Sequence, residues 1–270
     1  MKVLTLNLWH DAGPWRTRAQ LIRAEIARLE PDLIGFQEVL RGGDTDLARE
    51  LVGDAGYHVE FVRATGFWRD SRLAFGNAAA SRWPILARDE LRLPDAADGE
   101  TRAAISVTVD APLGPISFTS THLHWKLHHG AVRERQVRAL CDHVRARRPR
   151  GGFPPVMVGD FNAEPDSAEI RYVTGLQSLE GRSVYFADAW RVAGDGGRGF
   201  TWSNRNGYAR ASFEPDRRID YVFVGNPAAR GVGRVLRCRV VGCEPVEGVF
   251  PSDHFGVFAE LADEPEEAGA

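Results

Sequence analysis

The sequence predicts an α/β protein built on mixed β-sheets, and three observations support this. Between residues 3 and 63, apolar stretches of strand length alternate with stretches of helical periodicity in the order β-α-β-α-β. Between residues 77 and 122, short strands follow one another with only turns between them, which is typical of an antiparallel meander. Polar side chains also recur where the apolar strands end, which indicates a site at one edge of a sheet.

Each element is assigned from its periodicity and its turn residues. The helix at 16–29 is clear, because Ile22, Ile26 and Leu29 share one face and Pro31 ends it. Residues 204–216 are polar and predict an irregular surface loop. The predicted strands span 3–8, 32–39, 57–63, 77–81, 86–93, 103–109, 116–122, 155–160, 184–188, 200–202, 219–224, 232–241 and 255–261, and the predicted helices span 16–29, 45–52, 131–147 and 168–174.

The composition is that of an ordinary globular protein. The chain has 270 residues, of which 43% are hydrophobic and 26% are charged. We find no linker that divides it, so we expect a single catalytic domain over 1–262, followed by a disordered acidic tail at 263–270. The net charge of −3 provides no overall basic field for nucleic acid, although a local basic patch is compatible with it.

The cysteines and the hydropathy pattern predict a cytoplasmic location. Three cysteines without zinc-ligand spacing indicate reduced thiols in a reducing compartment. No stretch approaches 18 consecutive apolar residues, so no transmembrane segment is expected. The apolar run after Met1 is too short for a signal peptide. We expect the protein to be a monomer.

The stretch at 156–162 is the most informative for chemistry. An apolar strand reaches Gly159, and Asp160 and Asn162 follow it. Side chains two residues apart in extended backbone point to the same side, so this carboxylate and this amide can converge while Phe161 turns into the core. Such a pair suits the handling of a water and a charged oxygen. The alternative is that both residues only shape a strand-to-helix turn.

Other strand ends carry the same kind of polar residue: Asn7, Glu38, His122, Asp220, and the pair Asp253 and His254. A hard cation such as Mg²⁺ favours a few oxygen ligands, and Glu38, Asp253 and Asn7 offer them. The chain has no His-Glu-x-x-His, no Gly-x-Ser-x-Gly and no Gly-x₄-Gly-Lys-Ser/Thr pattern. These absences argue against a zinc protease, a serine hydrolase and a P-loop enzyme.

Six short segments carry these residues, and together they resemble motifs of the endonuclease/exonuclease/phosphatase superfamily. They span residues 4–257 in the order found in that family, which includes deoxyribonuclease I-like nucleases. The segments are Leu4-Thr5-Leu6-Asn7, Gly35-Phe36-Gln37-Glu38-Val39, Ser120-Thr121-His122-Leu123, Gly159-Asp160-Phe161-Asn162, Arg218-Ile219-Asp220-Tyr221 and Ser252-Asp253-His254-Phe255.

The resemblance implies a four-layer α/β sandwich, with two stacked mixed β-sheets flanked by helices. It also implies Mg²⁺- or Mn²⁺-dependent hydrolysis of a phosphodiester by direct in-line attack of water. By position, Glu38 corresponds to the principal metal ligand, and Asn7 and Asp253 assist it directly or through water.

The resemblance also implies the catalytic roles. Asp160 orients or deprotonates the attacking water, and Asn162 holds the scissile phosphate. His254 contacts the same phosphate, Asp220 pairs with His254, and His122 is a further donor on the phosphate side.

Four residues are weaker candidates for substrate binding. Asn77 lies in a segment that resembles the family, and Arg102 precedes a strand and could reach the phosphate. His124 and Lys126 follow His122 closely and could form a rim that faces the substrate. A structural or solvated role is the alternative for each.

The substrate class stays open among nucleic acid, a phospholipid head group and a small phosphoester. Five aromatic residues near predicted strand ends could form a rim that supports peripheral contact with a membrane: Trp9, Trp15, Phe67, Trp68 and Trp125. The alternative function is a catalytically inactive module of the same fold that binds phosphate and metal. Every matched catalytic position carries a competent residue, which favours the enzyme. An acidic cluster that binds metal only structurally would leave the pairs Asp220–His254 and Asp160–Asn162 unexplained.

Overall fold

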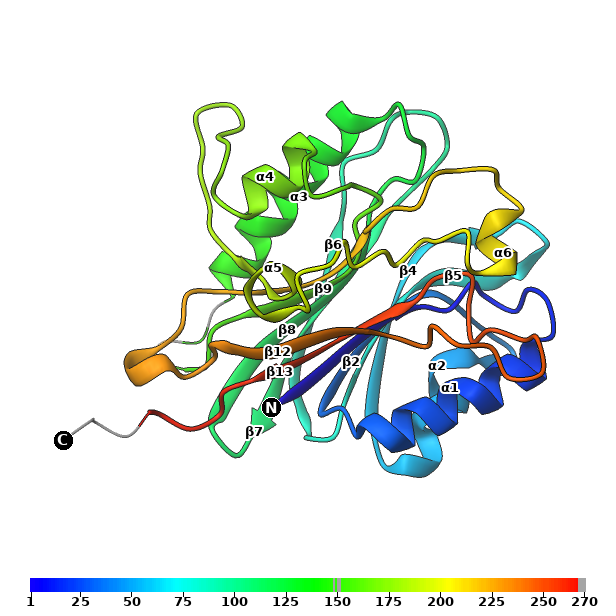
Figure 1. Ribbon diagram of the computed structural model, residues 1–270, viewed down its shortest axis with the longest axis horizontal. Helices are drawn as coiled ribbons and strands as arrows, with labels where there is room; N and C mark the ends of the chain where they lie inside the picture. Colours follow the sequence, from blue (N-terminus) through cyan, green and yellow to red (C-terminus); the bar gives the residue numbers. More distant parts are fainter. Residues whose placement is uncertain (148, 150–151, 267–270) are drawn as a thin grey trace.

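The computed structural model describes residues 1–147, 149 and 152–266, and it contains two β-sheets stacked face to face (Figure 1). The first sheet has the strand order β12-β13-β1-β2-β5-β4, with β3 paired to β2, and the second has the order β10-β11-β9-β8-β7-β6. Helices α1 and α2 lie outside the first sheet, and α3 and α4 lie outside the second. The predicted four-layer α/β sandwich is therefore confirmed.

The strands of the first sheet are β1 (Lys2–Asn7), β2 (Leu33–Gly42), β3 (Thr45–Asp46), β4 (His58–Phe67), β5 (Asp70–Ser81), β12 (Val235–Val241) and β13 (Gly256–Leu261). The strands of the second are β6 (Ile85–Arg92), β7 (Ala103–Ala111), β8 (Gly114–His122), β9 (Val156–Asp160), β10 (Ala187–Asp188) and β11 (Asp220–Val224). The helices are α1 (Trp15–Leu29), α2 (Leu47–Val52), α3 (Gly130–Ala146), α4 (Ala168–Val173), α5 (Ala189–Ala193) and α6 (Gly207–Arg210).

The layers follow from the two-residue alternation of the strands. In β1, Leu4 and Leu6 pack against the helical layer of the first sheet, while Val3 faces the second sheet. In β9, Val158 faces the first sheet, while Met157 packs toward α3 and α4. The central strands of each sheet thus bury both faces, one against the helices and one against the other sheet.

The core between the sheets changes from apolar to polar toward one edge. On the inner face of β9, Val158 is followed by Asp160, and on β11, Val222 is preceded by Asp220. The register places Asp160 opposite Asp220 on one side and His122 of β8 on the other. Three neighbouring strands therefore bring their polar ends to one place.

A glycine allows the two sheets to approach closely next to this edge. A Cβ atom on Gly35 would lie 2.3 Å from Val158 Cγ2 and 3.0 Å from Ser120 Oγ of the opposite sheet. One pleat further along, Gln37 Nε2 donates to Ser120 Oγ at 3.1 Å and links the two sheets. The close packing at Gly35 and the polar link beyond it mark where the apolar core ends.

The structure corrects the predicted meander. The strand predicted at 77–81 is the end of the longer β5, which pairs with β2 and β4 in the first sheet. Only β6, β7 and β8 form the antiparallel meander, and they lie in the second sheet. The chain crosses between the sheets at Trp83 and Pro84, where proline lacks the N–H that a continued ladder would need.

Several predicted boundaries also shift. The helix predicted from residue 45 begins at Leu47, because Thr45 and Asp46 pair with β2 and the Asp46 side chain caps the helix. The loop predicted at 204–216 contains the short helix α6, capped by Asn206. The strand predicted at 200–202 is reduced to isolated bridges at Trp202.

The N-terminus lies beside the C-terminal end of β13. The Met1 ammonium donates to Leu261 O at 2.8 Å and pairs with Asp263 at 3.0 Å. Residues 263–270 were predicted to be a disordered tail, but Asp263 pairs with Met1 and Glu266 pairs with Arg234. Residues 267–270 lie outside the described part of the chain. Among the described residues, no helix is long and apolar enough to cross a membrane.

The contact at Gly35 generates a stability prediction. Gly35→Ala should lower the free energy of unfolding by about 1–3 kcal/mol, because the new methyl group overpacks the space between the sheets. Gly53→Ala is the matched control, since Gly53 has αR backbone and no atom lies within 4 Å of the place that its methyl group would take. This control should be neutral or slightly stabilising. Urea denaturation measures both, and equal stability of the two variants would contradict the close-packing account.

Candidate active site

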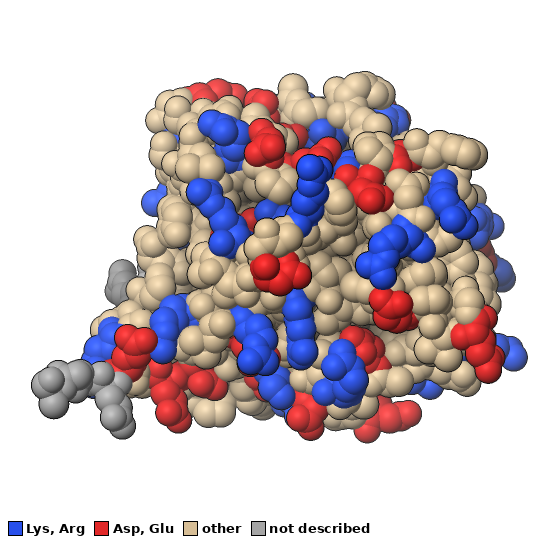
Figure 2. All heavy atoms as spheres, in the orientation of Figure 1, with Lys and Arg blue, Asp and Glu red and all other residues tan. Residues whose placement is uncertain are grey.

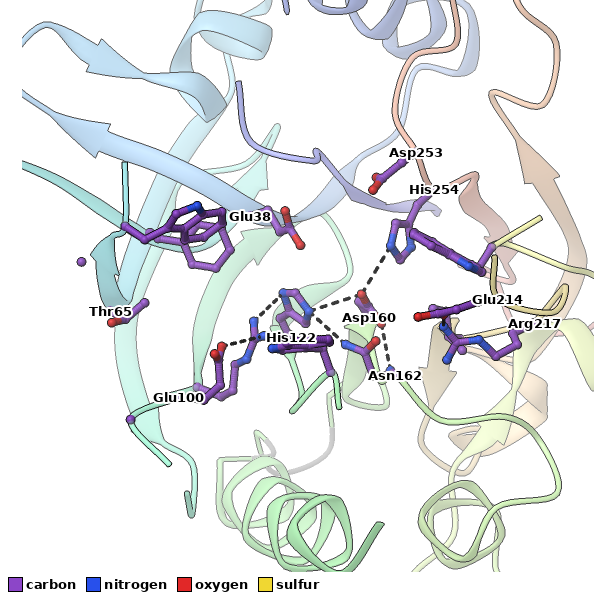
Figure 3. A pocket seen from close by; sticks show the side chains of 18 residues that line it. Glu38, Thr65, Glu100, His122, Asp160, Asn162, Glu214, Arg217, Asp253 and His254 are labelled. Carbon is purple, nitrogen blue, oxygen red and sulfur yellow. Dashed lines mark hydrogen bonds and ion pairs between the residues drawn. The ribbon is translucent and has the colours of Figure 1, made fainter. Parts of the chain in front are cut away.

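A cavity of about 540 Å³ opens at the edge where the polar strand ends meet (Figure 3). The predicted site residues that line it are Glu38, Arg102, His122, Asp160, Asn162, Asp253 and His254. Five other predicted residues, Asn7, Asn77, His124, Lys126 and Asp220, lie outside this lining.

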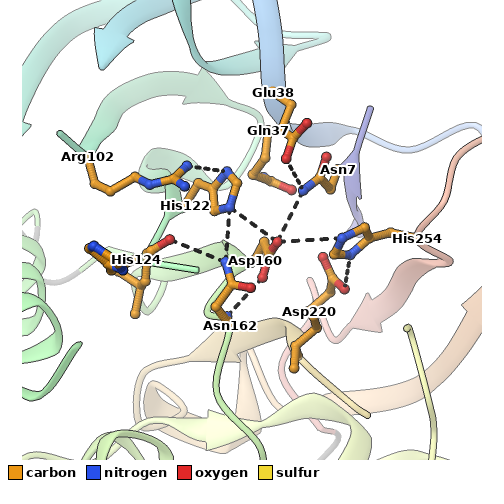
Figure 4. Close-up of polar contacts among 12 residues, drawn as sticks. Asn7, Gln37, Glu38, Arg102, His122, His124, Asp160, Asn162, Asp220 and His254 are labelled. Carbon is orange, nitrogen blue, oxygen red and sulfur yellow. Dashed lines mark hydrogen bonds and ion pairs between the residues drawn. The ribbon is translucent and has the colours of Figure 1, made fainter. Parts of the chain in front are cut away.

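Asp160 is the centre of the polar network (Figure 4). Its Oδ2 atom accepts a hydrogen bond from Asn7 Nδ2 at 3.1 Å and lies 3.3 Å from His122 Nε2 and 3.8 Å from His254 Nε2. Its Oδ1 atom accepts the backbone N–H of Asn162 at 2.8 Å. The carboxylate is therefore fixed on both oxygens, and its nearest partners are donors.

His254 is held as a cation by carboxylates. Its Nδ1 atom lies 2.9 Å from Asp220 Oδ2, so the Nδ1 proton is donated there and Nε2–H faces Asp160 and the cavity. Burial by itself lowers the pKa of His254, but the carboxylates of Asp220 and Asp160 outweigh it and raise the pKa well above its ordinary value. Burial, together with the nearby Asp220, raises the pKa of Asp160.

His122 has the opposite character. Burial lowers its pKa well below the ordinary value, and the positive charges of Arg102 and His254 lower it further. Arg102 can only donate, so its contact of 3.0 Å with His122 Nδ1 leaves the proton of the neutral ring on Nε2. The Asn162 amide, 3.0 Å from Nε2, can turn either end toward it. The site thus holds one charged and one neutral histidine on the same carboxylate.

A β-bulge aims Glu38 into the cavity. The pairing of β2 with β5 shifts register between Phe36 and Val39, and Glu38 has a left-handed φ of +58°. Gln37 can then face the other sheet while Glu38 turns toward the cavity. Asn162 also has a positive φ, +49°, so two site residues occupy a backbone region that costs about 1–3 kcal/mol outside glycine.

Hydrogen bonds fix the loop that carries Asp253. Ser252 Oγ donates to the carbonyl oxygen of Asn7 at 2.7 Å and lies 3.1 Å from Asp253 Oδ1. The Asn206 amide donates to the carbonyl oxygens of Ser252 and Asp253. Asn206 was missed in the sequence, where it looked like an ordinary loop residue.

Arg18 is a second supporting residue that the sequence analysis missed. It is fully buried, and its guanidinium donates to the carbonyl oxygens of Leu8, Ala12 and Pro251, among others. These bonds connect the segment after Asn7 to the segment before Asp253. A signal was present, because Arg18 shares the apolar face of its helix with Ile22.

The acidic residues fit a hard divalent cation. Glu38 and Asp253 point into the same cavity as Asp160, and burial raises the pKa of both, since the site lacks enough positive charge for their ionised forms. Carboxylate oxygens are the preferred ligands of Mg²⁺ and Mn²⁺. Asn7 donates from Nδ2 to Glu38 at 3.3 Å, and its Oδ1 accepts from Trp9 N at 2.9 Å, so its amide positions the carboxylates.

The remaining substrate-binding candidates have partners of their own. Asn77 donates to the carbonyl oxygen of Ala103 at 2.7 Å and so connects the two sheets. His124 Nε2 and Lys126 Nζ lie 3.2 and 2.6 Å from Asp98 Oδ2. Arg102 is the one of these four candidates that lines the cavity.

The fold and the site together define a phosphoesterase-like α/β sandwich with a polar cavity at the end of its stacked sheets. Residues 4–254 match the Endonuclease/Exonuclease/phosphatase family, and the chain belongs to this family. The activities in the family's name all hydrolyse phosphoesters.

Two curated relatives match part of the chain. Carbon catabolite repressor protein 4 homolog 3 of Arabidopsis thaliana is 30% identical over 167 residues, which are 60% of this chain and 36% of the relative. A probable RNA exonuclease of Schizosaccharomyces pombe is 25% identical over 165 residues, which are 57% of this chain and 32% of the relative. The matches thus span about a third of the length of each relative.

Solved structures share the fold over nearly the whole chain. An endonuclease/exonuclease/phosphatase from Beutenbergia cavernae superposes with a TM-score of 0.72 and 26% identity, over 97% of this chain and 71% of that one. Truncated Caenorhabditis elegans TDP2 superposes with a TM-score of 0.74 and 21% identity, over 97% of each chain. The human Nocturnin catalytic domain with bound sulfate superposes with a TM-score of 0.73 and 21% identity, over 97% of this chain and 93% of that one.

The buried guanidinium generates the second prediction. Arg18→Lys keeps the charge but loses the fork of donors, so carbonyl groups that Arg18 satisfies lose their partners. We expect the free energy of unfolding to fall by about 2–4 kcal/mol, which is the cost of leaving one or two buried groups without a hydrogen bond. Arg16→Lys, at an exposed position of the same helix, should change it little. Thermal or urea unfolding measures both, and a neutral Arg18→Lys variant would contradict the supporting role.

Proposed function

We propose that the protein is a metal-dependent phosphodiesterase that hydrolyses its substrate by direct attack of water. The observation that carries this proposal is the arrangement around Asp160. A buried carboxylate lies between a protonated His254 and a neutral His122, while Glu38 and Asp253 face the same cavity. Phosphoester hydrolysis needs a placed water, neutralised phosphate charge and a stabilised leaving oxygen, and these residues suit those tasks.

The two histidines and Asn162 bind the phosphate. His254 offers a charged Nε2–H and His122 a neutral one, both within reach of the cavity. The negative charge on the phosphoryl oxygens increases along the reaction, so preorganised donors stabilise the transition state more than the bound substrate. Asp220 acts through His254, because it fixes the tautomer and the charge of that ring.

Asp160 orients the attacking water and accepts its proton. Its pKa is raised by burial, which makes it a stronger base than an exposed aspartate. Asn7 and the backbone N–H of Asn162 hold both oxygens, so the carboxylate keeps its direction without substrate. The water that it places must lie opposite the leaving oxygen for in-line displacement.

Glu38 and Asp253 would hold Mg²⁺ or Mn²⁺. When bound, the ion supplies Lewis-acid polarisation of the phosphoryl group and neutralises its negative charge. Without a bound cation, the negative charges of Glu38 and Asp253 lie in the same buried site, where His254 is the principal positive charge.

The substrate carries nucleobases next to the scissile phosphodiester. Trp68 and Trp125 line the cavity with 66% and 50% of their surfaces exposed, and Trp202 forms another part of its wall. Aromatic faces at the mouth of a phosphoesterase site favour stacking with planar bases. A relative with partial sequence similarity is named as a probable RNA exonuclease, which agrees with this class.

The charges favour a chain end or a short nucleotide over a long polymer. Arg102 and Arg217 line the cavity, but each is paired with a glutamate, Glu100 and Glu214. Figure 2 shows basic and acidic side chains intermixed over the face in view, rather than a continuous basic track. Tracking a long phosphate backbone requires unpaired Lys and Arg along a groove.

The direct test is hydrolysis of a substrate panel with Mg²⁺, Mn²⁺ or EDTA. The panel contains single- and double-stranded DNA, RNA, a dinucleotide, sphingomyelin, an inositol phosphate, and chromogenic mono- and diesters. We expect cation-dependent cleavage of nucleotide diesters that EDTA abolishes. Cleavage of the lipid or the inositol phosphate alone would contradict the substrate class, and no cleavage with intact metal binding would support an inactive binding module.

Substitutions at the centre of the network test the mechanism. Asp160→Asn and His254→Ala should each lower kcat by about 10²–10⁴-fold, because they remove the water-orienting base and a phosphate donor. His58→Ala, at an exposed position of β4, is the control. Circular dichroism must show that all three fold, and a His254→Ala enzyme with unchanged kcat would rule out the assigned role.

The aromatic wall gives a separate prediction about substrate preference. Trp125→Ala should raise KM for a dinucleotide by about 5–150-fold, the magnitude of one lost base-stacking contact, and leave KM for a chromogenic diester nearly unchanged. Phe213→Ala, which removes an aromatic ring that is 95% exposed and outside the cavity lining, should alter neither constant. Equal effects of Trp125→Ala on both substrates would count against stacking.

A further inference from the structure

A cluster of two histidines and an aspartate lies beside the cavity and has no part in the proposed hydrolysis. Asp98 Oδ2 lies 3.2 Å from His124 Nε2 and 3.9 Å from His129 Nδ1. The three potential ligand atoms all lie within 4.8 Å of one another. Ligands of one tetrahedral zinc ion lie about 3.3 Å apart, as follows from zinc–ligand bonds of about 2.0–2.1 Å. We infer that Asp98, His124 and His129 form a second cation site, specific for a transition metal such as Zn²⁺.

His129 provides an independent sign of a missing ligand. Its Nδ1 atom is buried and has no hydrogen-bond partner among the described residues, although it faces the Asp98 carboxylate. The ring packs against His124 and His128, each with 4.4 Å between ring centroids, which restricts its rotation. A buried nitrogen without a partner is uncommon in proteins, and a bound cation would satisfy it.

The loop that carries the two histidines is fixed before any ion binds. Arg133 of α3 is buried, and its guanidinium donates to the carbonyl oxygens of His124, Lys126 and Leu127 at 3.2, 2.7 and 3.2 Å. Glu169 of α4 holds the same guanidinium at 2.8 Å. The imidazoles therefore do not need to be ordered by the metal, which lowers the cost of binding.

Lys126 pairs with the carboxylate that the cation would bind. Its ammonium lies 2.6 Å from Asp98 Oδ2, and its side chain is 31% exposed, so it can move into solvent when a metal binds. When His124 Nε2 binds a metal, the proton of the neutral ring lies on Nδ1. The hydrogen bond of 3.3 Å that Lys126 N donates to His124 Nδ1 is then lost.

The mixed ligand set defines the class of metal. Two imidazole nitrogens and one carboxylate favour Zn²⁺ or a similar transition metal, whereas the all-oxygen set of Glu38 and Asp253 favours Mg²⁺. A metal at the second site would also connect two segments of the cavity wall, residues 98–100 and residues 124–129. Asp98 directly precedes Gly99 and Glu100, and Trp125 lies between the two histidines in the sequence. Gly99, Glu100 and Trp125 line the cavity.

Equilibrium binding of Zn²⁺ to the full chain tests this inference without reference to activity. Isothermal titration calorimetry is run in excess Mg²⁺, which competes for the carboxylates of the proposed catalytic site. We expect one Zn²⁺ site, weakened at least tenfold in His129→Asn and unchanged in His58→Asn, which replaces an exposed histidine of β4. Lys126→Met should tighten it, because the competing ammonium is removed.

Two further results separate this site from the catalytic one. Zn²⁺ should raise the unfolding temperature of the wild type and of Glu38→Ala, and should not raise that of His129→Asn. Circular dichroism of the metal-free variants checks folding, and the Lys126→Met result keeps the test decisive if His129→Asn does not fold. The inference is overturned if Zn²⁺ binds wild type and His129→Asn equally, if Lys126→Met weakens binding, or if Glu38→Ala alone abolishes it.

Discussion

Two buried carboxylates, Asp160 and Asp220, lie opposite each other in the pairing of β9 and β11, and His254 makes this arrangement possible. Like charges in a medium of low dielectric repel strongly, so the pair requires a cation between or beside its members. The imidazolium of His254 supplies one positive charge to both. Its remaining N–H then faces the cavity, so the group that stabilises the buried acids is also placed to bind a phosphate. Glu38 and Asp253 depend on the charge of the same His254 and have no ion pair of their own among the described residues, which is the physical reason to expect a divalent cation there.

The sandwich creates this site by ending its inner core with polar residues on several strands at once. Parallel pairing of β8 with β9 brings His122 beside Asp160, and the antiparallel β11 begins where β9 ends. Buried supports outside the sheets then fix the loops: Arg18 connects two segments through their carbonyl groups, as Arg133 does for the loop after β8. Both arginines act by hydrogen bonding to backbone, and both lie on the buried face of a helix.

Much of the site could be predicted from sequence, because alternation in strands is a local property. The i, i+2 spacing of Asp160 and Asn162 and the strand-end position of Asp220 required only a strand assignment and the family resemblance. Glu38 was expected at the end of a strand over 32–39, but β2 continues to Gly42, so Glu38 lies inside the strand. The β-bulge at Glu38 could not be predicted, since it depends on how β2 pairs with β5. The division of the meander between two sheets is also a long-range property, which turn residues do not encode. His124 and Lys126 were expected at a substrate rim, but their partner Asp98 lies in a loop that no local pattern connects to them.

The central claim is that water, placed by Asp160, attacks phosphorus directly. Hydrolysis of a dinucleotide in water enriched in ¹⁸O, with Mg²⁺, tests it most directly. The account predicts one ¹⁸O atom in the phosphate of the product under single-turnover conditions, no label in the released alcohol, and loss of the reaction in Asp160→Asn. Label in the alcohol, an unlabelled phosphate after the first turnover, or equal rates in wild type and Asp160→Asn would contradict it.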